Sequence, residues 1–414
     1  MKTTKRMKTT KRMIVLSAGV VSLACGNMMA APNVTIDSVV QRWPWNNKVD
    51  ITYTVNDGQN VTNGTFYRLV FTATVKDVDY VIDGVTNIGA SANTGTHIVT
   101  WTAPAGIKQT EFQMVASLYA ADKPSGDDYM IVDLDSGAVS YEGLLASQAL
   151  SDARYNQSTY KTGNMVFRKV AAGGTYPTGD DRHLYNVNRA KEWTTDKDYY
   201  IGIFMVTQAQ WKKLRGDNPS NWKAEKTGND YHLRPVDKVS KSDVRGDISP
   251  AADTGSDING SFMERLNALT GIGGFDLPTE VMFEIAERAG ATNTFSWGNE
   301  IDLDYIVCKE NVTDDSSQEV GSRNANKWGL FDTSGNLWEW VRDDGSVSNL
   351  YSVPDPWTPA SSGSDARIRG GDAWYNSATE DTSYNNKFRA SSRITRGTGD
   401  GHMSVGFRVA RIVQ

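Results

Sequence analysis

The chain has 414 residues, is 39% hydrophobic and 10% aromatic, and carries a formal net charge of −6. This length and composition exclude an intrinsically disordered protein and allow two or three domains. The negative charge argues against nucleic acid as a partner, because binding to phosphates depends on clustered Lys and Arg. Beyond the N-terminal region no apolar run approaches 18 residues, so we expect no transmembrane segment.

Residues 1–30 have the pattern of a secretory signal peptide. Six basic residues precede an apolar run of 12 residues, from Met13 to Ala24, and small residues lead to a predicted cleavage point after Ala30. Cleavage removes those six basic residues and no acidic residue, which moves the net charge from −6 to −12. Cys25 offers an alternative as a bacterial lipoprotein site, although the usual Leu three residues earlier is missing. We expect a secreted, periplasmic or cell-surface protein.

Residues 31–145 alternate apolar and polar side chains over several short segments that are separated by turn sequences. This pattern predicts an all-β sandwich of the immunoglobulin or fibronectin type, acting as a spacer or adhesion module. The side chains expected to face its core are Val49, Ile51, Tyr53, Val55, Tyr67, Leu69, Phe71, Ala73, Val75, Phe112, Met114, Ala116, Leu118, Met130, Val132 and Leu134. Residues 146–163 are small and polar, and we interpret them as a linker.

Residues 164–414 form the second predicted domain, in which three helices have recognisable ends. Each begins at an N-cap Ser or Thr and ends before a Gly that suits a left-handed backbone, and two have a complete capping-box pattern. The cap residues are Thr207, Gln210 and Gly216; Ser261, Glu264 and Gly271; and Thr279 and Gly290. After Gly290 the periodicity stops, which predicts long loops organised by metal ions or side-chain hydrogen bonds.

Five phrases in a fixed order, together with residues 198–222, resemble the formylglycine-generating enzyme family, also called sulfatase-modifying factors. The resemblance covers residues 165–414 and implies an irregular fold related to C-type lectins, with bound Ca²⁺. The fold class predicted for the whole chain is therefore α+β. The phrases are FDLPTEVMFEIAERAG (275–290), FSWGN (295–299), KWGLFDTSGNLWEWVRD (327–343), RIRGGDAWYN (367–376) and VGFRVAR (405–411).

The resemblance implies a calcium site in the segment DTSGNLWEW. Its ligands would be the side chains of Asp332 and Glu339 and the backbone carbonyls of Gly335 and Leu337. Carboxylates and carbonyls are the hard oxygen ligands that Ca²⁺ prefers. The alternative is a local turn in which Asp332 accepts backbone amides. A second calcium site of the family has no clear match in residues 301–322.

The same resemblance implies that the oxidase chemistry is absent. Active family members carry a Ser after two glycines and then two cysteines that bind copper, but here the Ser and first Cys positions hold Asp372 and Tyr375. Cys308 is the one cysteine after the signal peptide, and Cu(I) binding requires thiolate ligands. The four histidines lie far apart, which argues against the iron site of the related sulfoxide synthases. We expect neither copper binding nor oxidase activity.

Aromatic and amide side chains replace the copper loop and are typical of recognition surfaces. In this respect the segment also resembles variable receptor proteins of diversity-generating retroelements. One alternative is that Trp374 belongs to the core and the asparagines fill turns. Others are an enzyme or accessory factor that modifies secreted sulfatases, and a structural surface protein that binds through its β-sandwich. The predicted ligand-binding residues, for an unknown protein or glycan, are Asp372, Trp374, Tyr375, Asn376, Tyr384, Asn385 and Arg389.

Overall fold

The computed structural model describes most of the chain after the predicted signal peptide. The described residues are 33–42, 47–56, 65–75, 78–82, 95–103, 112–122, 126–144, 154–180, 191–223, 226, 229–246, 260–312, 314–344, 353–359, 365–379, 387–399 and 401–413. The predicted signal peptide and Cys25 lie outside them. Apart from residues 84–91, the chain up to Asp122 forms one unit and residues 123–414 form another.

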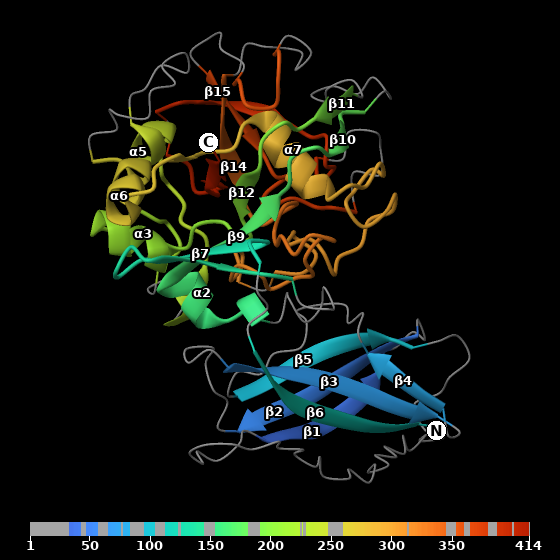
Figure 1. The fold of residues 1–414 in the computed structure, drawn as a ribbon. Helices are drawn as coiled ribbons and strands as arrows, with labels where there is room; N and C mark the ends of the chain where they lie inside the picture. Colours follow the sequence, from blue (N-terminus) through green and yellow to red (C-terminus); the bar gives the residue numbers. More distant parts are fainter. Residues whose placement is uncertain are drawn as a thin grey trace. The chain divides into compact units, whose positions relative to one another are not determined.

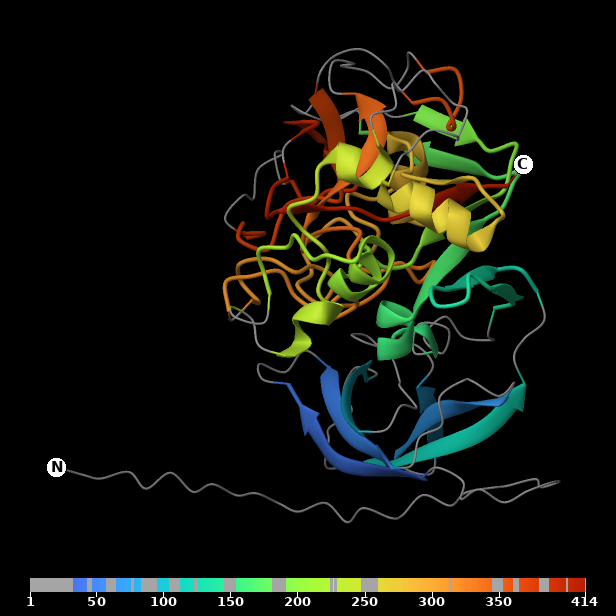
Figure 2. The same ribbon diagram turned by 90° about the vertical axis from the view of Figure 1, so that its left-hand side faces the viewer.

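The first unit consists of two three-stranded antiparallel sheets (Figures 1 and 2). One sheet has the order β1 (Asn33–Gln41), β2 (Lys48–Asn56), β5 (Gly95–Thr102), and the other has the order β4 (Val78–Ile82), β3 (Thr65–Val75), β6 (Phe112–Asp122). The predicted alternation is present in β2, where Val49, Ile51, Tyr53 and Val55 are all buried. Tyr53 also packs edge-on against Phe71 of the other sheet, with 5.0 Å between ring centroids. The immunoglobulin or fibronectin type stays a prediction.

The second unit contains a six-stranded antiparallel sheet, which corrects one part of the predicted domain organisation. Its order is β13 (Phe275–Asp276), β18 (Ala410–Ile412), β12 (Tyr199–Gly202), β9 (Asn164–Val170), β7 (Tyr129–Asp133), β8 (Val139–Glu142). Strand β7 was predicted to belong to the sandwich, but Ile131 pairs with Val166 of β9. The boundary therefore precedes β7 and does not lie at residue 145, because alternation identifies a strand without identifying the strand beside it.

The described part of the predicted linker is also part of the second unit. Tyr155 and Tyr160, the latter in helix α2 (Ser158–Thr162), are buried in its main hydrophobic core. The Arg154 guanidinium lies 4.3 Å from the centroid of the Tyr155 ring and donates a hydrogen bond to the Gly143 carbonyl. Residues 154–163 are thus a packed element and not a solvated linker. Burial of their aromatic side chains contributes free energy that stabilises the fold.

The three predicted helices are confirmed as α3 (Gln208–Arg215), α6 (Phe262–Thr270) and α7 (Glu280–Arg288). The capping box of α3 is complete, whereas in the first turn of α6 the Glu264 carboxylate accepts from the Gly260 amide instead of the Ser261 amide. Helix α7 ends one residue early, because Ala289 takes the left-handed conformation expected of Gly290. Besides α2, the described residues contain two further short helices that were not predicted: the 3-10 helix η3 (Asn229–Leu233) and helix α5 (Lys241–Arg245).

A second sheet brings together segments from the irregular C-terminal part of the chain. Its order is β16 (Ile394–Gly397), β15 (Asp365–Arg369), β14 (Trp338–Asp344), β17 (Val405–Gly406), and a separate hairpin pairs β10 (Thr175–Thr178) with β11 (Lys191–Thr194). Helix α7 lies beside β14 and β15 (Figure 1). Among the described residues, no helix is long and apolar enough to cross a membrane.

Candidate functional site

Helix α7 supplies three buried carboxylates beside the two ends of the segment that follows β15. Glu280, Glu284 and Glu287 are spaced four and three residues apart, which places them on neighbouring turns of the helix. Each has at most 1% of its surface exposed. Thr279 caps the helix by accepting a hydrogen bond from the Met282 amide. The capped helix therefore holds three acidic groups where water cannot solvate them.

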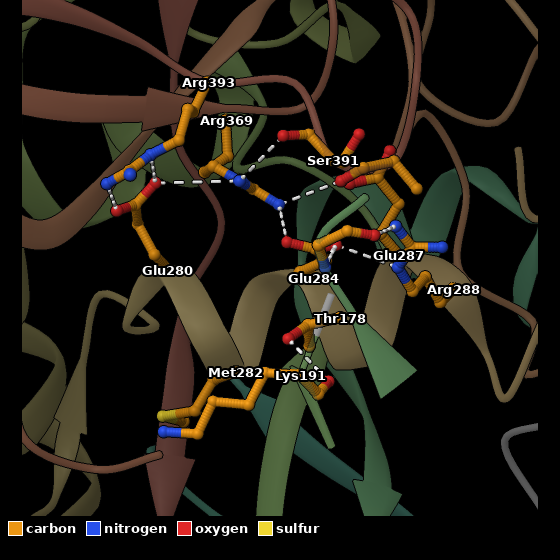
Figure 3. Close-up of polar contacts among 12 residues, drawn as sticks. Thr178, Lys191, Glu280, Met282, Glu284, Glu287, Arg288, Arg369, Ser391 and Arg393 are labelled. Carbon is orange, nitrogen blue, oxygen red and sulfur yellow. Dashed lines mark hydrogen bonds and ion pairs between the residues drawn. The ribbon is translucent and has the colours of Figure 1, made fainter. Parts of the chain in front are cut away.

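Two arginines from outside the helix pair with these carboxylates (Figure 3). Arg369, the last residue of β15, lies 2.6 Å from Glu284 Oε2, and Arg393, just before β16, donates from Nε to Glu280 Oε1 at 2.8 Å. Burial alone raises the pKa of Glu284, but Arg369 and Arg288 outweigh it and hold this pKa below its ordinary value. Because Arg369 and Arg393 flank residues 370–392, one helix holds both ends of that segment.

Glu287 takes part in a different contact. Its Oε1 accepts a hydrogen bond from Ser334 Oγ at 3.0 Å, and the same hydroxyl donates to the Phe388 carbonyl at 2.8 Å. Burial raises the pKa of Glu287 well above its ordinary range.

The predicted calcium segment lies in the core of the second unit. Glu339 is fully buried, and Arg408 donates from Nε and Nη2 to its two carboxylate oxygens, both at 2.7 Å. Asp332 accepts from the Gly321 amide at 2.7 Å, so its partner is distant in sequence and the contact is not the local turn of the alternative interpretation. Gly335 is required here because a Cβ atom would lie 2.7 Å from the Val307 carbonyl oxygen.

The residues of this segment fit a cation in charge and ligand type. Burial raises the pKa of both Asp332 and Glu339, and the charge of Asp332 adds to the rise for Glu339. Arg408 already supplies one positive charge to Glu339. No cluster of three or more His, Cys, Asp or Glu side chains suited to a metal occurs in the described part of the chain. A cation here would therefore depend on backbone carbonyls as well as on the two carboxylates.

Asp372, at the family's Ser position, organises the turn that follows the two glycines. Its Oδ1 accepts hydrogen bonds from the Trp338 indole at 3.2 Å, from the Ala373 amide at 2.9 Å and from the Asn376 side chain. The ammonium group of Lys387 lies 3.7 Å from Oδ2. The side chain is buried, so it supports the loop and offers little surface to a ligand.

Of the other predicted ligand-binding residues, some are buried and some keep part of their surface exposed. Trp374 and Arg389 each have 3% of their surface exposed, so the prediction that they contact a ligand is corrected. Trp374 packs edge-on against Trp222 and Tyr375, at 5.1 Å between centroids in both pairs. Tyr375 and Asn376 are half-buried, whereas Tyr384 and Asn385 lie outside the described residues. The accessible part of the described loop is therefore centred on Tyr375 and Asn376.

Glu310 anchors the same loop and was not recognised in the sequence. Its carboxylate accepts hydrogen bonds from the Ser377 hydroxyl, from the Ala378 amide at 3.0 Å and from the Thr379 hydroxyl at 2.9 Å. The neighbouring Cys308 is fully buried, and burial raises the pKa of its thiol to about 12. An acid in an aperiodic loop has no sequence signal for this role, because its partners lie 67 to 69 residues away.

Asp237 is a buried acid that sequence reasoning also missed. It has no exposed surface, and its Oδ1 accepts a hydrogen bond from the Asn221 amide at 2.7 Å. Its Oδ2 has no hydrogen-bond partner among the described residues. Burial raises the pKa of Asp237 to about 7. Since Asn221 precedes Trp222, this acid helps to position the ring that packs on Trp374.

Comparison with known proteins supports the family resemblance. Residues 153–413 match the family described as "Sulfatase-modifying factor enzyme 1-like domain". The chain belongs to this family. It is 31% identical over 149 residues to a formylglycine-generating enzyme from Streptomyces coelicolor, covering 32% of this chain and 46% of that protein. It is 28% identical over 145 residues to the bovine "Inactive C-alpha-formylglycine-generating enzyme 2", covering 32% of this chain and 43% of that protein. The chain thus spans less than half the length of both.

A third relative shares a longer region, and one solved structure aligns with part of the chain. The chain is 27% identical over 232 residues to "Chaperone protein LppX" from Paenibacillus barcinonensis, covering 47% of this chain and 76% of that protein. The structure of Treponema denticola variable protein 1 is 21% identical and aligns with a TM-score of 0.49, covering 60% of this chain and 95% of that chain.

Substitution of Asp237 tests the burial of this acid. Because its native pKa of about 7 exceeds the ordinary 3.8, the folded protein binds the proton more tightly than the unfolded chain. The free energy of unfolding should therefore fall as pH rises from about 4 to about 7. Asp237→Asn should remove this fall and be more stable than the wild type at pH 8 in urea unfolding.

The exposed Asp230→Asn serves as the control, and its stability should follow that of the wild type at both pH 5 and pH 8. An Asp237→Asn variant whose difference from the wild type is the same at both pH values would contradict the assignment.

Proposed function

We propose that this protein is an exported binding protein built on the formylglycine-generating enzyme scaffold, and that it lacks copper oxidase activity. One observation carries the proposal: the Ser and first Cys positions of the oxidase hold Asp372 and Tyr375. The carboxylate of Asp372 is engaged by three donors that shape the loop. An oxidase nucleophile or metal ligand at these positions would need a different residue type and a different environment.

The chemistry of the one remaining cysteine supports the loss of copper binding. Cu(I) sites require soft thiolate ligands, and the thiolate is the form that binds metals. Cys308 is buried, and with a pKa of about 12 its thiol keeps its proton near neutral pH. The similarity to a mammalian relative described as inactive supports a family branch that keeps the fold and lacks the oxidase activity.

The accessible part of the loop supports recognition of another molecule. Tyr375 and Asn376 provide an aromatic ring and an amide, and Lys387 is exposed beside Asp372. Aromatic and amide side chains give contact area and adaptable hydrogen bonds at interfaces. The relative described as a chaperone favours a protein as the bound partner. Action on secreted sulfatases is the second candidate, favoured by the similarity to a formylglycine-generating enzyme.

Loop variants test the binding proposal. The double variant Tyr375→Ala/Lys387→Ala removes accessible groups and leaves Asp372 and the buried ion pairs in place. On arrays of secreted proteins and glycans, we expect it to lose at least about tenfold in affinity for ligands that the wild type binds, as removal of central contacts does at other interfaces.

The exposed Lys327→Ala is the control and should bind as the wild type does. Unchanged ligand affinity in the double variant would overturn the binding proposal. Oxygen consumption by the copper-loaded wild type with a cysteine-containing sulfatase peptide would instead support the second candidate.

We further propose that Asp332 and Glu339, with the carbonyls of Gly335 and Leu337, hold one Ca²⁺ ion. Asp332 and Glu339 are both buried, and Arg408 pairs with Glu339 alone, so a divalent cation would balance charge that burial otherwise penalises. The ion would supply rigidity to the loops between α7 and β14. Arg408 would keep its contacts with Glu339 and would orient that carboxylate.

Chelation tests this calcium site. Ligand binding to the native state alone raises the free energy of unfolding by about 2.7 kcal/mol at a free concentration one hundred times the dissociation constant. Excess EGTA should therefore lower the melting temperature by several degrees. Asp332→Asn should respond less to EGTA than the wild type. A melting temperature that is identical with and without EGTA would count against the site.

We also propose a location outside the cytoplasm and a spacer role for the first unit. The signal-like residues 1–30 support export. The two three-stranded sheets of the first unit support an immunoglobulin-like or fibronectin-like module. N-terminal sequencing of the protein from a culture supernatant or envelope fraction would distinguish cleavage after Ala30 from lipid attachment at Cys25.

A further inference from the structure

A groove of about 370 Å³ lies between helix α3 and the 3-10 helix η3 of the second unit. Its size falls in the range of sites that bind small molecules. None of its residues comes from the 370–392 segment, so it is separate from the loop surface proposed above. The lining residues are Gln208, Ala209, Lys212, Lys213, Asn218, Tyr231 and His232.

The floor of the groove is held rigidly by hydrogen bonds. Asn218 donates to Gln208 Oε1 at 2.9 Å, and Gln208 in turn donates to the Trp222 carbonyl at 2.8 Å. The Asn218 side-chain oxygen accepts from the Ser220 amide at 3.1 Å. The helix beside it is fixed by the complete capping box at Thr207. The groove is thus pre-formed, which lowers the entropy cost of binding.

The charges on the groove distinguish it from the rest of an acidic chain. Among the described residues, its lining contains two lysines and a histidine but no carboxylate. Lys213 forms an ion pair with Asp135, whereas Lys212 is exposed and has no acidic partner among the described residues. In a protein of net charge −6, an anion is repelled by most of the surface and is attracted to such a position.

Tyr231 adds an aromatic surface beside the unpaired ammonium group. It is half-buried and packs edge-on against His232, with 5.9 Å between ring centroids, so its orientation is constrained. An aromatic ring offers an apolar face with a polar tip, and the neighbouring cation attracts a carboxylate. The groove therefore combines the two groups needed for a ligand that has both an apolar face and a negative charge.

We propose that this groove binds a carboxylate-bearing sugar ring, with Lys212 at the carboxylate and Tyr231 against the ring. The role goes beyond recognition by the 370–392 loop and does not depend on it. Since Lys212 is exposed, the interaction is electrostatic in origin and weakens as salt is added. Neutral sugars lack the group that Lys212 recognises.

Calorimetric titration of the full-length protein with sodium D-glucuronate tests the proposal. We expect saturable binding to the wild type, at least about tenfold weaker binding to Lys212→Gln, and unchanged binding to the control Lys327→Gln. This loss corresponds to one charge-assisted hydrogen bond. Lys212→Gln should have the same melting temperature as the wild type, because the Lys212 side chain is exposed.

Two further probes separate the sugar from the charge. D-glucose should bind at least about tenfold more weakly than glucuronate, and acetate should also bind more weakly because it offers nothing to Tyr231. Tyr231→Ala should weaken glucuronate binding, whereas Tyr375→Ala/Lys387→Ala should not change it. The proposal is overturned if glucuronate does not saturate, if Lys212→Gln binds it as the wild type does, or if acetate binds equally tightly.

Discussion

The buried ion pairs between helix α7 and the residues that flank the 370–392 segment are the constraint on which the site depends. Charged groups that leave water lose solvation free energy, and they remain ionised in a protein interior when partners replace that solvation. Glu280 and Glu284 can therefore be buried because Arg393 and Arg369 reach them, and the arginines are buried for the same reason. The pairs fix the two ends of the segment without using any residue between them.

This arrangement explains how the family scaffold tolerates a changed loop. The family's Ser and Cys positions lie between the two anchored ends, so their replacement by Asp372 and Tyr375 leaves the anchors unchanged. Asp372 supports the loop from within, and Glu310 supports it from a distant segment. A second buried pair, between Glu339 and Arg408, ties the C-terminal strands to β14. The shape of this unit thus rests on the buried pairs, whereas the function proposed above rests on the loop.

The parts of the fold that were predictable from sequence are those set by local chemistry. The caps at Thr207, Ser261 and Thr279 involve residues three positions apart, so the helices could be identified directly. The partner of β7 could not be identified, because strand pairing is non-local and its alternation suits either unit. For the same reason the aromatic residues near Tyr155 were interpreted as part of a linker.

The candidate site was predictable only in part. The family positions located the loop, but burial distinguishes Trp374, which packs in the core, from Tyr375 beside it. Asp237, Glu287 and Glu310 carry no local signal, because each interacts with residues at least 15 positions away. Acidic residues are common in this chain, and only the three-dimensional structure shows which of them are buried or accept hydrogen bonds from distant segments.

A double-mutant cycle on Glu284 and Arg369 tests the central claim that buried ion pairs anchor the loop. Breaking a buried pair from one side leaves an uncompensated charge, so Glu284→Gln and Arg369→Met should each lower the free energy of unfolding by about 3–5 kcal/mol. The double variant should lose much less than the sum of the two, because it leaves no unpaired charge between these positions. Single losses below about 1 kcal/mol, or losses that add in the double variant, would contradict the account.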